Sequence, residues 1–185
     1  MSSIIAVVGS RSLPLSWRNR VESVVGSLVS RGHSVGSGGA LGADLFALRA
    51  CVLSGSGACS GSVVFLPGRV ESSPLPCHHW LSAFRHLGGE VVVGPARLGA
   101  RRDEFVPALF ARSQSLVRHS QGVVAFIFGR SSGSWFTCRF AVSLGLPVVV
   151  YPVEGVGALR SLGFGRWVPL HSWAGSFRWE VDHAK

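Results

Sequence analysis

The sequence predicts an α/β fold in which a parallel sheet carries helices on both faces. Short, uninterrupted apolar runs recur along the chain, and stretches with apolar residues at helical spacing separate them. Apolar runs without polar alternation are typical of strands that are buried on both faces, and their alternation with helices predicts parallel connections. The 185 residues, 47% of them hydrophobic, fit one domain with ample material for a core.

The first half of the chain begins this alternation. Residues 4–8 form a short apolar run and the first expected strand. Residues 17–29 carry apolar side chains on one helical face, with Ser16 as the expected N-cap and Gly32 as the end of the helix. The next expected elements are a strand at 33–37, a helix at 44–53 and a flexible Gly/Ser loop at 54–61.

The second half repeats the pattern up to residue 152. Pro107 sets the expected start of one helix, because the residue before a proline avoids helical geometry while the first turn of a helix accepts proline. This start leaves Arg101 and Arg102 on the preceding loop. The expected strands are 62–66, 90–93, 123–128 and 147–151, and the expected helices are 77–87, 107–119 and 135–144.

The periodicity fades beyond Pro152, where Trp167, Trp173, Phe177 and Trp179 lie among Gly, Pro and Ser. We expect residues 1–152 to form the domain and residues 153–185 to form an irregular, aromatic-rich extension that packs on the core, because burial of large aromatic side chains contributes much free energy. The alternative is an aromatic surface for a partner.

The charge favours a polyanionic partner. The formal net charge is +9, and all but Lys185 of the 18 basic residues are arginine, which binds phosphate with two parallel hydrogen bonds. No apolar segment has the length of a membrane span, and the first residues lack the charged region of a signal peptide. We therefore expect a cytoplasmic protein without membrane contact.

Cysteine and histidine spacing does not indicate a metal site. The four cysteines match no zinc framework, and the one metal-like cluster, Cys77-His78-His79, directs adjacent side chains to different sides of a helix or strand. We expect neither a metal nor a cofactor.

Three glycine- and serine-rich turns each follow an expected strand and precede a helix. They are the first turn (residues 9–12), the second turn (37–44) and the third turn (129–138). Unsatisfied N–H groups and the helix dipole make a helix N-terminus an anion site, usually for phosphate. Because the turns follow strands of one parallel sheet, we expect them to meet at its carboxyl edge and to hold a phosphate-bearing ligand.

Five segments then suggest a family. In chain order they are IAVVGSR (5–11), SGGALGAD (37–44), RSQSLV (112–117), SGSWFT (132–137) and GLPV (145–148). Together they resemble the SLOG superfamily, which includes the DNA-processing protein DprA, the LOG phosphoribohydrolases and the YspA/YpsA-type nucleotide-binding proteins. The resemblance covers about residues 4–152 and implies a Rossmann-like domain.

The resemblance implies DprA-like binding of single-stranded nucleic acid. A small-nucleotide binder or sensor of the YspA/YpsA type is the alternative, and a LOG-like hydrolase is disfavoured, because no carboxylate stands where those enzymes carry their catalytic glutamate.

DprA-like members usually carry arginine where this chain has Leu41, and asparagine where it has Ser113. The oligomeric state stays open, with a homodimer as one alternative. We expect a binding module rather than an enzyme.

The candidate site consists of turn residues and one helix face. Asp44 is either a helix cap or a hydrogen-bond partner of ligand or loop, and Arg112 is either a solvated charge or, as the resemblance implies, a site residue. Ser131 also fits a hydrolase nucleophile motif, a reading that we disfavour because the acid and histidine that it requires would come from the irregular tail. No catalytic residue is assigned. The predicted ligand- and phosphate-binding residues are Gly9, Ser10, Arg11, Gly38, Gly39, Ala40, Gly42, Asp44, Arg112, Ser115, Ser132, Gly133, Ser134 and Thr137.

Overall fold

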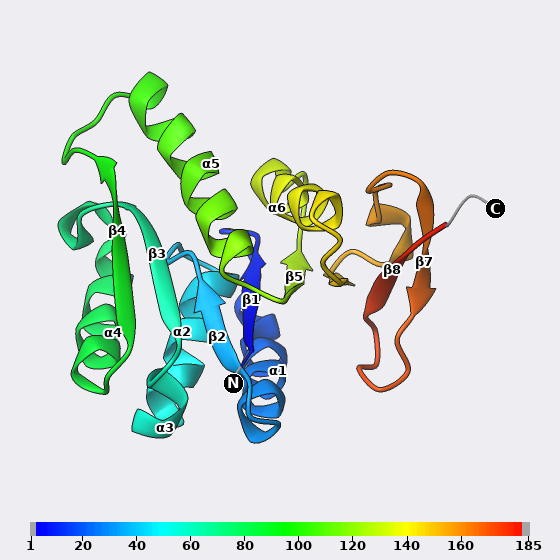
Figure 1. Ribbon diagram of the computed structural model, residues 1–185, viewed down its shortest axis with the longest axis horizontal. Helices are drawn as coiled ribbons and strands as arrows, with labels where there is room; N and C mark the ends of the chain where they lie inside the picture. Colours follow the sequence, from blue (N-terminus) through cyan, green and yellow to red (C-terminus); the bar gives the residue numbers. More distant parts are fainter. Residues whose placement is uncertain (1–2, 183–185) are drawn as a thin grey trace.

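A computed structural model describes residues 3–182 and confirms the α/β fold (Figure 1). The eight strands are β1 (Ile4–Gly9), β2 (Ser34–Ser37), β3 (Val63–Gly68), β4 (Glu90–Ala96), β5 (Gly122–Ile127), β6 (Val148–Pro152), β7 (Gly165–Pro169) and β8 (Phe177–Val181). The six α-helices are α1 (Arg18–Ser30), α2 (Ala43–Leu53), α3 (Ser56–Cys59), α4 (Leu75–His86), α5 (Arg102–Arg118) and α6 (Ser132–Ser143).

The strands form one sheet in the order β4-β3-β2-β1-β5-β6-β8-β7. The six strands from β4 to β6 are parallel, and β8 and β7 add an antiparallel hairpin. The chain therefore builds outward from β1 to β4, returns through α5, and continues on the other side of β1 with β5. Such a reversal separates the loops that follow the two central strands and opens a crevice at their carboxyl ends.

Two hydrophobic clusters cover the two faces of the sheet. Val7 of β1 points into a cluster with α1, α2 and α4, whereas its neighbours Ala6 and Val8 point into a cluster with α5 and α6. This alternation is the two-residue period of a strand that is buried on both faces. The helices thus lie on both sides of the sheet, as predicted (Figure 1).

Helix α5 begins at Arg102 rather than at Pro107, which corrects the sequence prediction. Proline removes only one helical hydrogen bond here, the one to the carbonyl of Asp103. Asp103 and Glu104 lie in the first turn, where acidic side chains interact favourably with the helix dipole. The earlier start places Arg102 on the helix instead of the loop.

Three further local expectations were wrong. Residues 54–61 contain the short helix α3, in which Ala58 and Cys59 are buried, instead of a flexible loop. Ser16 does not cap α1, because a 3-10 turn (Leu15–Trp17) precedes that helix and Trp17 is its N-cap residue. The segment after residue 152 is not irregular throughout, because β7 and β8 extend the sheet and Trp179 is buried against Trp167, with ring centroids 5.1 Å apart.

Candidate functional site

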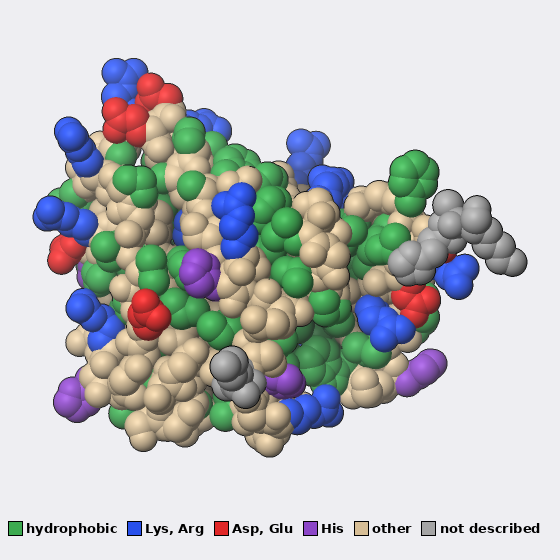
Figure 2. All heavy atoms as spheres, in the orientation of Figure 1, with side chains coloured by type: hydrophobic (Ala, Val, Ile, Leu, Met, Phe, Trp, Pro, Cys, Tyr) green, Lys and Arg blue, Asp and Glu red, His purple; other side chains and the backbone are tan. Residues whose placement is uncertain are grey.

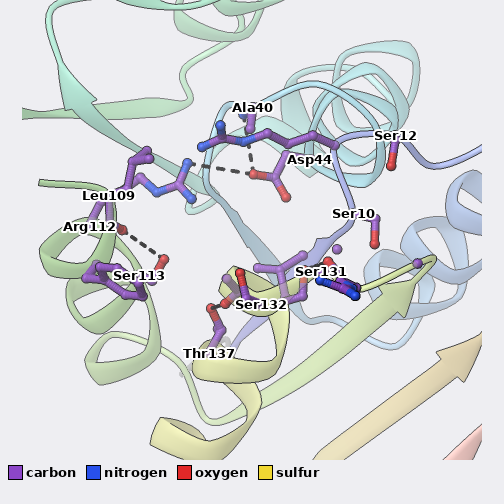
Figure 3. A pocket seen from close by; sticks show the side chains of 18 of the residues that line it. Ser10, Ser12, Ala40, Asp44, Leu109, Arg112, Ser113, Ser131, Ser132 and Thr137 are labelled. Carbon is purple, nitrogen blue, oxygen red and sulfur yellow. Dashed lines mark hydrogen bonds and ion pairs between the residues drawn. The ribbon is translucent and has the colours of Figure 1, made fainter. Parts of the chain in front are cut away.

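The reversal of the strand order opens a cavity of about 520 Å³ at the carboxyl ends of β1 and β5 (Figure 3). We call it the main cavity. Residues of all three turns line it, together with one side of α5. Its lining consists of Val8, Gly9, Ser10, Arg11, Ser12, Ala40, Asp44, Arg102, Val106, Leu109, Phe110, Arg112, Ser113, Leu116, Phe128, Gly129, Arg130, Ser131, Ser132, Gly133, Ser134 and Thr137.

The first turn is tied tightly to the third. A Cβ on Gly9 would lie 2.2 Å from the carbonyl oxygen of Phe126, so only glycine allows this approach of β1 to β5. The hydroxyl of the buried Ser10 donates to the carbonyl of Phe128 and accepts from its N–H, each at 2.8 Å. Ser10 therefore joins the two turns, and its hydroxyl is already engaged. The exposed Arg11 lines the cavity.

The second turn folds around Asp44. This residue occupies the second position of α2, whose N-cap residue is Gly42, so Asp44 is not the cap. Its Oδ2 accepts a hydrogen bond from the N–H of Ala40 at 3.3 Å, which bears out the loop N–H alternative. Burial raises the pKa of the Asp44 carboxyl, and the positive charge of Arg112 opposes that shift.

Arg112 reaches from α5 into the second turn. Its Nη1 donates to the carbonyl of Gly38 and lies 3.9 Å from Oδ2 of Asp44. Only 13% of its side chain is exposed, and burial lowers the pKa of its guanidinium. Its Nε is buried without a hydrogen-bond partner, although an arginine Nε always carries a hydrogen. Arg112 is therefore an enclosed side chain at the cavity wall rather than a solvated helix charge, and it retains one donor.

The third turn presents free donors at the start of α6. Gly129 and Ser131 both have positive φ, 64° and 28°, which turns the backbone from β5 into the helix. Among the described residues, the N–H groups of Ser132 and Gly133 have no acceptor. The N–H of Gly129 donates to the carboxylate of Glu154 at 2.9 Å, a contact that the sequence did not suggest.

The hydroxyl groups of Ser131, Ser134 and Thr137 form hydrogen bonds within the third turn. Ser131 donates to the hydroxyl of Ser134 at 2.8 Å, and Thr137 donates to the carbonyl of Gly133 at 3.0 Å. No histidine lies among the described residues that line the cavity, so no imidazole is available there to activate Ser131. The nucleophile interpretation of Ser131 therefore gains no support from the geometry.

The lining of the main cavity is strongly basic. Four of its residues are arginines and one, Asp44, is a carboxylate, which gives a formal charge of 4 − 1 = +3. Basic side chains also outnumber acidic ones on the face drawn in Figure 2. A concave site lined by one sign of charge attracts the opposite charge, here an anion.

The structure brings most of the predicted residues together. Gly38 and Gly39 line a neighbouring cavity instead of the main one, and Gly42 lines neither, because it packs against the backbone of Ser10. Ser115 lines neither cavity, and Ser113 faces the main cavity in its place. The predicted residues in the main cavity are Gly9, Ser10, Arg11, Ala40, Asp44, Arg112, Ser132, Gly133, Ser134 and Thr137.

Sequence reasoning missed several lining residues. Because Pro107 predicts a helix that starts there, Arg102 is predicted on a loop, whereas α5 begins at Arg102 and brings this residue to the cavity wall. Arg130 lay within the third turn but was not selected, although its charge was a usable signal. Phe110 and Leu109 carried no signal that distinguishes a cavity wall from a core position.

Neither a metal centre nor a membrane span is found within residues 3–182. No three His, Cys, Asp or Glu side chains of this range are grouped as metal ligands would be. His78 instead bonds to the carbonyl of Ser73 at 2.9 Å, and Cys77 is buried. None of the described helices combines the length and the apolar character that crossing a bilayer requires.

Comparison with solved structures finds the same fold. DNA processing protein A from Helicobacter pylori, described with a unique mode of single-stranded DNA binding, aligns with a TM-score of 0.61 and 19% identity over 81% of this chain and 65% of its own. DNA processing protein A (DprA) from Streptococcus pneumoniae aligns with a TM-score of 0.60 and 20% identity over 82% of this chain and 50% of its own. The chain thus spans about half to two thirds of these relatives.

Comparison with curated protein sequences gives no match. The model of the family described as DNA recombination-mediator protein A, in contrast, matches residues 1–163. That range contains β1 to β6, all six helices and every residue that lines the main cavity. The chain therefore belongs to the DNA recombination-mediator protein A (DprA) family.

Proposed function

We propose that this protein binds single-stranded DNA in the main cavity, with backbone phosphates as the groups that it holds. The observation that carries the proposal is the convergence of four arginines and the open N-terminus of α6 on one cavity at the strand reversal. Arginine guanidinium groups and helix N–H groups are the donors that proteins use for phosphate oxygens.

The individual donors have different roles in this proposal. Arg11 and Arg130 are exposed at the cavity and can follow a mobile phosphate, whereas Arg112 is fixed by Asp44 and Gly38. The N–H groups of Ser132 and Gly133 supply fixed donors at the start of α6, in the same cavity. Ser10 has no free hydroxyl for a phosphate and acts instead through the geometry of the two turns that it joins.

A binder of small nucleotides is the second candidate function. The size of the main cavity, about 520 Å³, is within the range of small-ligand sites, and a single phosphate could occupy the donors of the third turn alone. The relative from Helicobacter pylori is described as a binder of single-stranded DNA, which favours the longer ligand for a member of the same family.

One binding experiment separates the two functions. Fluorescence anisotropy with a labelled oligothymidylate is measured at several salt concentrations and then in the presence of excess mononucleotide. We expect affinity for the oligomer to fall steeply with salt, since each neutralised phosphate of a single strand contributes about −0.7 to the slope of log K against log salt concentration. A mononucleotide that binds as tightly as the oligomer, with a shallow salt dependence, would establish the second function instead.

A further inference from the structure

The third turn already holds one anion that belongs to the chain itself. Oε2 of Glu154 accepts a hydrogen bond from the N–H of Gly129 at 2.9 Å. Gly129 lines the main cavity, whereas Glu154 is not part of that lining and reaches the turn from the loop that follows β6. A carboxylate therefore occupies one donor of the turn that we propose for phosphate.

The backbone keeps Glu154 beside the third turn. Strands β5 and β6 pair in parallel, so their carboxyl ends lie next to each other. The N–H of Val153 donates to the carbonyl of Ile127 at 2.9 Å, and the N–H of Gly155 donates to the carbonyl of Pro152 at 3.0 Å. Main-chain contacts on both sides thus fix the position of Glu154, which does not depend on the bond that its side chain makes.

The carboxylate of Glu154, in contrast, is held by a single contact. The residue is exposed, and in the part of the chain that the structure describes its carboxylate has no other hydrogen bond and no ion pair. Asp44, the carboxylate of the main cavity, is only 5% exposed, bonds to Ala40 and faces Arg112. Because water can replace the partner of an exposed carboxylate, Glu154 can leave its contact at a low cost in free energy, whereas Asp44 cannot.

A phosphate in the cavity would find more donors at this turn than Glu154 uses. The N–H groups of Ser132 and Gly133 have no acceptor among the described residues, and the exposed Arg130 lines the same cavity. The φ angles of Gly129 and Ser131 are positive, and turns of this kind can gather their N–H groups around one anion. Carboxylate and phosphate compete for such donors, and a phosphate can bond to several of them at once, whereas Glu154 bonds only to Gly129.

We propose that Glu154 is a displaceable internal anion that competes with the bound strand for the third turn. In the free protein its carboxylate occupies the N–H of Gly129. When the strand binds, a backbone phosphate takes this donor and the side chain of Glu154 turns out into water. This inference rests on the proposed function, since it requires a phosphate at the third turn. Glu154 thereby weakens every ligand that places a phosphate there, so that a ligand with further contacts in the cavity is needed for tight binding.

The first test removes the charge of Glu154 and keeps its hydrogen-bond acceptor. The amide oxygen of Glu154→Gln can still accept from the N–H of Gly129, so the variant should fold like the parent, which a thermal melt checks. Anisotropy with a labelled oligothymidylate should show affinity that is about two- to fivefold higher than in the parent, the range that exposed charged contacts give.

Glu90→Gln is the matched control, because it removes the same charge far from the cavity. Glu90 is exposed, begins β4 at the amino edge of the parallel sheet, and lines neither cavity. Its affinity for the oligothymidylate should stay close to that of the parent.

The second test follows the amide proton of Gly129 by NMR in isotope-labelled protein. In the free proteins this resonance should differ between the parent and Glu154→Gln, because the acceptor changes from a carboxylate to an amide oxygen. With saturating oligothymidylate the two resonances should coincide, since a phosphate is then the acceptor in both proteins. A side chain that only holds the turn in shape would keep the difference in the complex.

Unchanged or lower affinity of Glu154→Gln would overturn the competition and leave the proposed function intact. An equal gain in Glu90→Gln would overturn it as well, because net charge alone would then explain the gain. A difference at Gly129 that persists in the saturated complex would show that Glu154 stays on the turn. If the oligothymidylate binds neither parent nor variant at low salt, the proposed function itself fails, and the role of Glu154 fails with it.

Discussion

Arg112 and Asp44 form the most enclosed charged pair among the interactions that the structure describes. Their side chains are 13% and 5% exposed, and each also bonds to the backbone of the second turn, at Gly38 and Ala40. The pair therefore supports the shape of the turn, and the net positive charge of the cavity comes from the other three arginines. The sequence could single out both residues from their motifs, but not their pairing, because the contact joins elements that are distant in the chain.

This difference between fixed and mobile arginines leads to a first prediction. Arg11→Ala should weaken oligothymidylate binding about tenfold or more, since a hydrogen bond to a charged group contributes about 1.5–3 kcal/mol, and it should leave the free energy of unfolding unchanged. Arg112→Ala should weaken binding too, but it should also cost about 3 kcal/mol of stability by leaving Asp44 buried without its partner.

Anisotropy and urea denaturation measure the two effects separately. Arg31→Ala serves as the control, because Arg31 is exposed and lines neither cavity. A loss of affinity in the control as large as in Arg11→Ala would show that net charge, rather than position in the cavity, governs binding. An Arg112→Ala variant as stable as the parent would contradict the structural role of the pair.

The second prediction concerns pH. Burial raises the pKa of Asp44 above its ordinary value of 3.8, so the folded protein keeps this proton to a higher pH than the unfolded chain does. The contribution to stability is therefore fully present below pH 3.8 and is lost as the pH rises through the raised pKa. Relative to Asp44→Asn, the parent protein should become less stable over that rise in pH.

Urea denaturation of both proteins across the acidic range gives the difference in the free energy of unfolding. If the parent instead becomes more stable relative to Asp44→Asn as the pH rises, then Arg112 and the loop N–H groups outweigh burial and lower the pKa of Asp44. The sign of this change with pH tests the prediction, whatever the size of the pKa shift.

At the scale of elements, the site depends on how the three turns are held against one another. Gly42 has φ +71°, and a Cβ there would lie 2.1 Å from the carbonyl oxygen of Ser10. The second turn thus packs directly on the first, and Ser10 in turn bonds to Phe128, directly before the third. This close packing requires a glycine at position 42, although Gly42 does not line the cavity.

We therefore predict that Gly42→Ala destabilises the protein by more than 1 kcal/mol, since a positive φ disfavours alanine and the new methyl group collides with backbone. It should also weaken oligothymidylate binding by separating the first two turns. Gly57→Ala in α3 is the matched control, because Gly57 has open space and no positive φ, so alanine there should be neutral or stabilising. Thermal melts and anisotropy of both variants test the pair, and equal behaviour would refute the role of Gly42.

Local sequence patterns predict some of the elements and not others. The apolar runs of β1, β5 and β6 and the periodicity of α1 and α2 could be predicted, because buried strands and amphipathic helices carry strong local signals. The start of α5 could not, since the local effect of Pro107 was overridden by the remainder of the helix. Strands β7 and β8 were missed because they are short and are stabilised by a cross-strand pair, Trp167 and Trp179, that only the hairpin brings together.

For the whole molecule, the strand order decides where the site lies. The pairing of β1 with both β2 and β5 creates the reversal, and it joins strands that are distant in the chain. The turns predicted the carboxyl edge of the sheet, because each follows a strand. The resemblance implied a site residue on α5, Arg112, but neither it nor the turns predicted which face of that helix closes the cavity or that a second cavity adjoins it, since both depend on the packing of helices against that edge.

The same arrangement leads to the last prediction, that the protein does not release the base from nucleoside monophosphates. Cleavage of an N-glycosidic bond builds positive charge on the sugar, which an enzyme must stabilise with a negative group. Asp44 is the one carboxylate among the described residues that line the main cavity, and it is buried, bonded to Ala40 and paired with Arg112. The four arginines around it would oppose the developing charge.

Purified protein incubated with AMP and the other monophosphates should therefore give no free base above background, measured by chromatography against a no-protein control. Asp44→Asn should give the same result, since the carboxylate is held by Ala40 and Arg112 and is not expected to contact the sugar. Turnover that is present in the parent and absent in Asp44→Asn would contradict it, because that outcome requires Asp44 to leave Arg112 and contact the sugar. The pair that shapes the second turn would then have to open in every catalytic cycle, and the stability of Arg112→Ala would become the next quantity to measure.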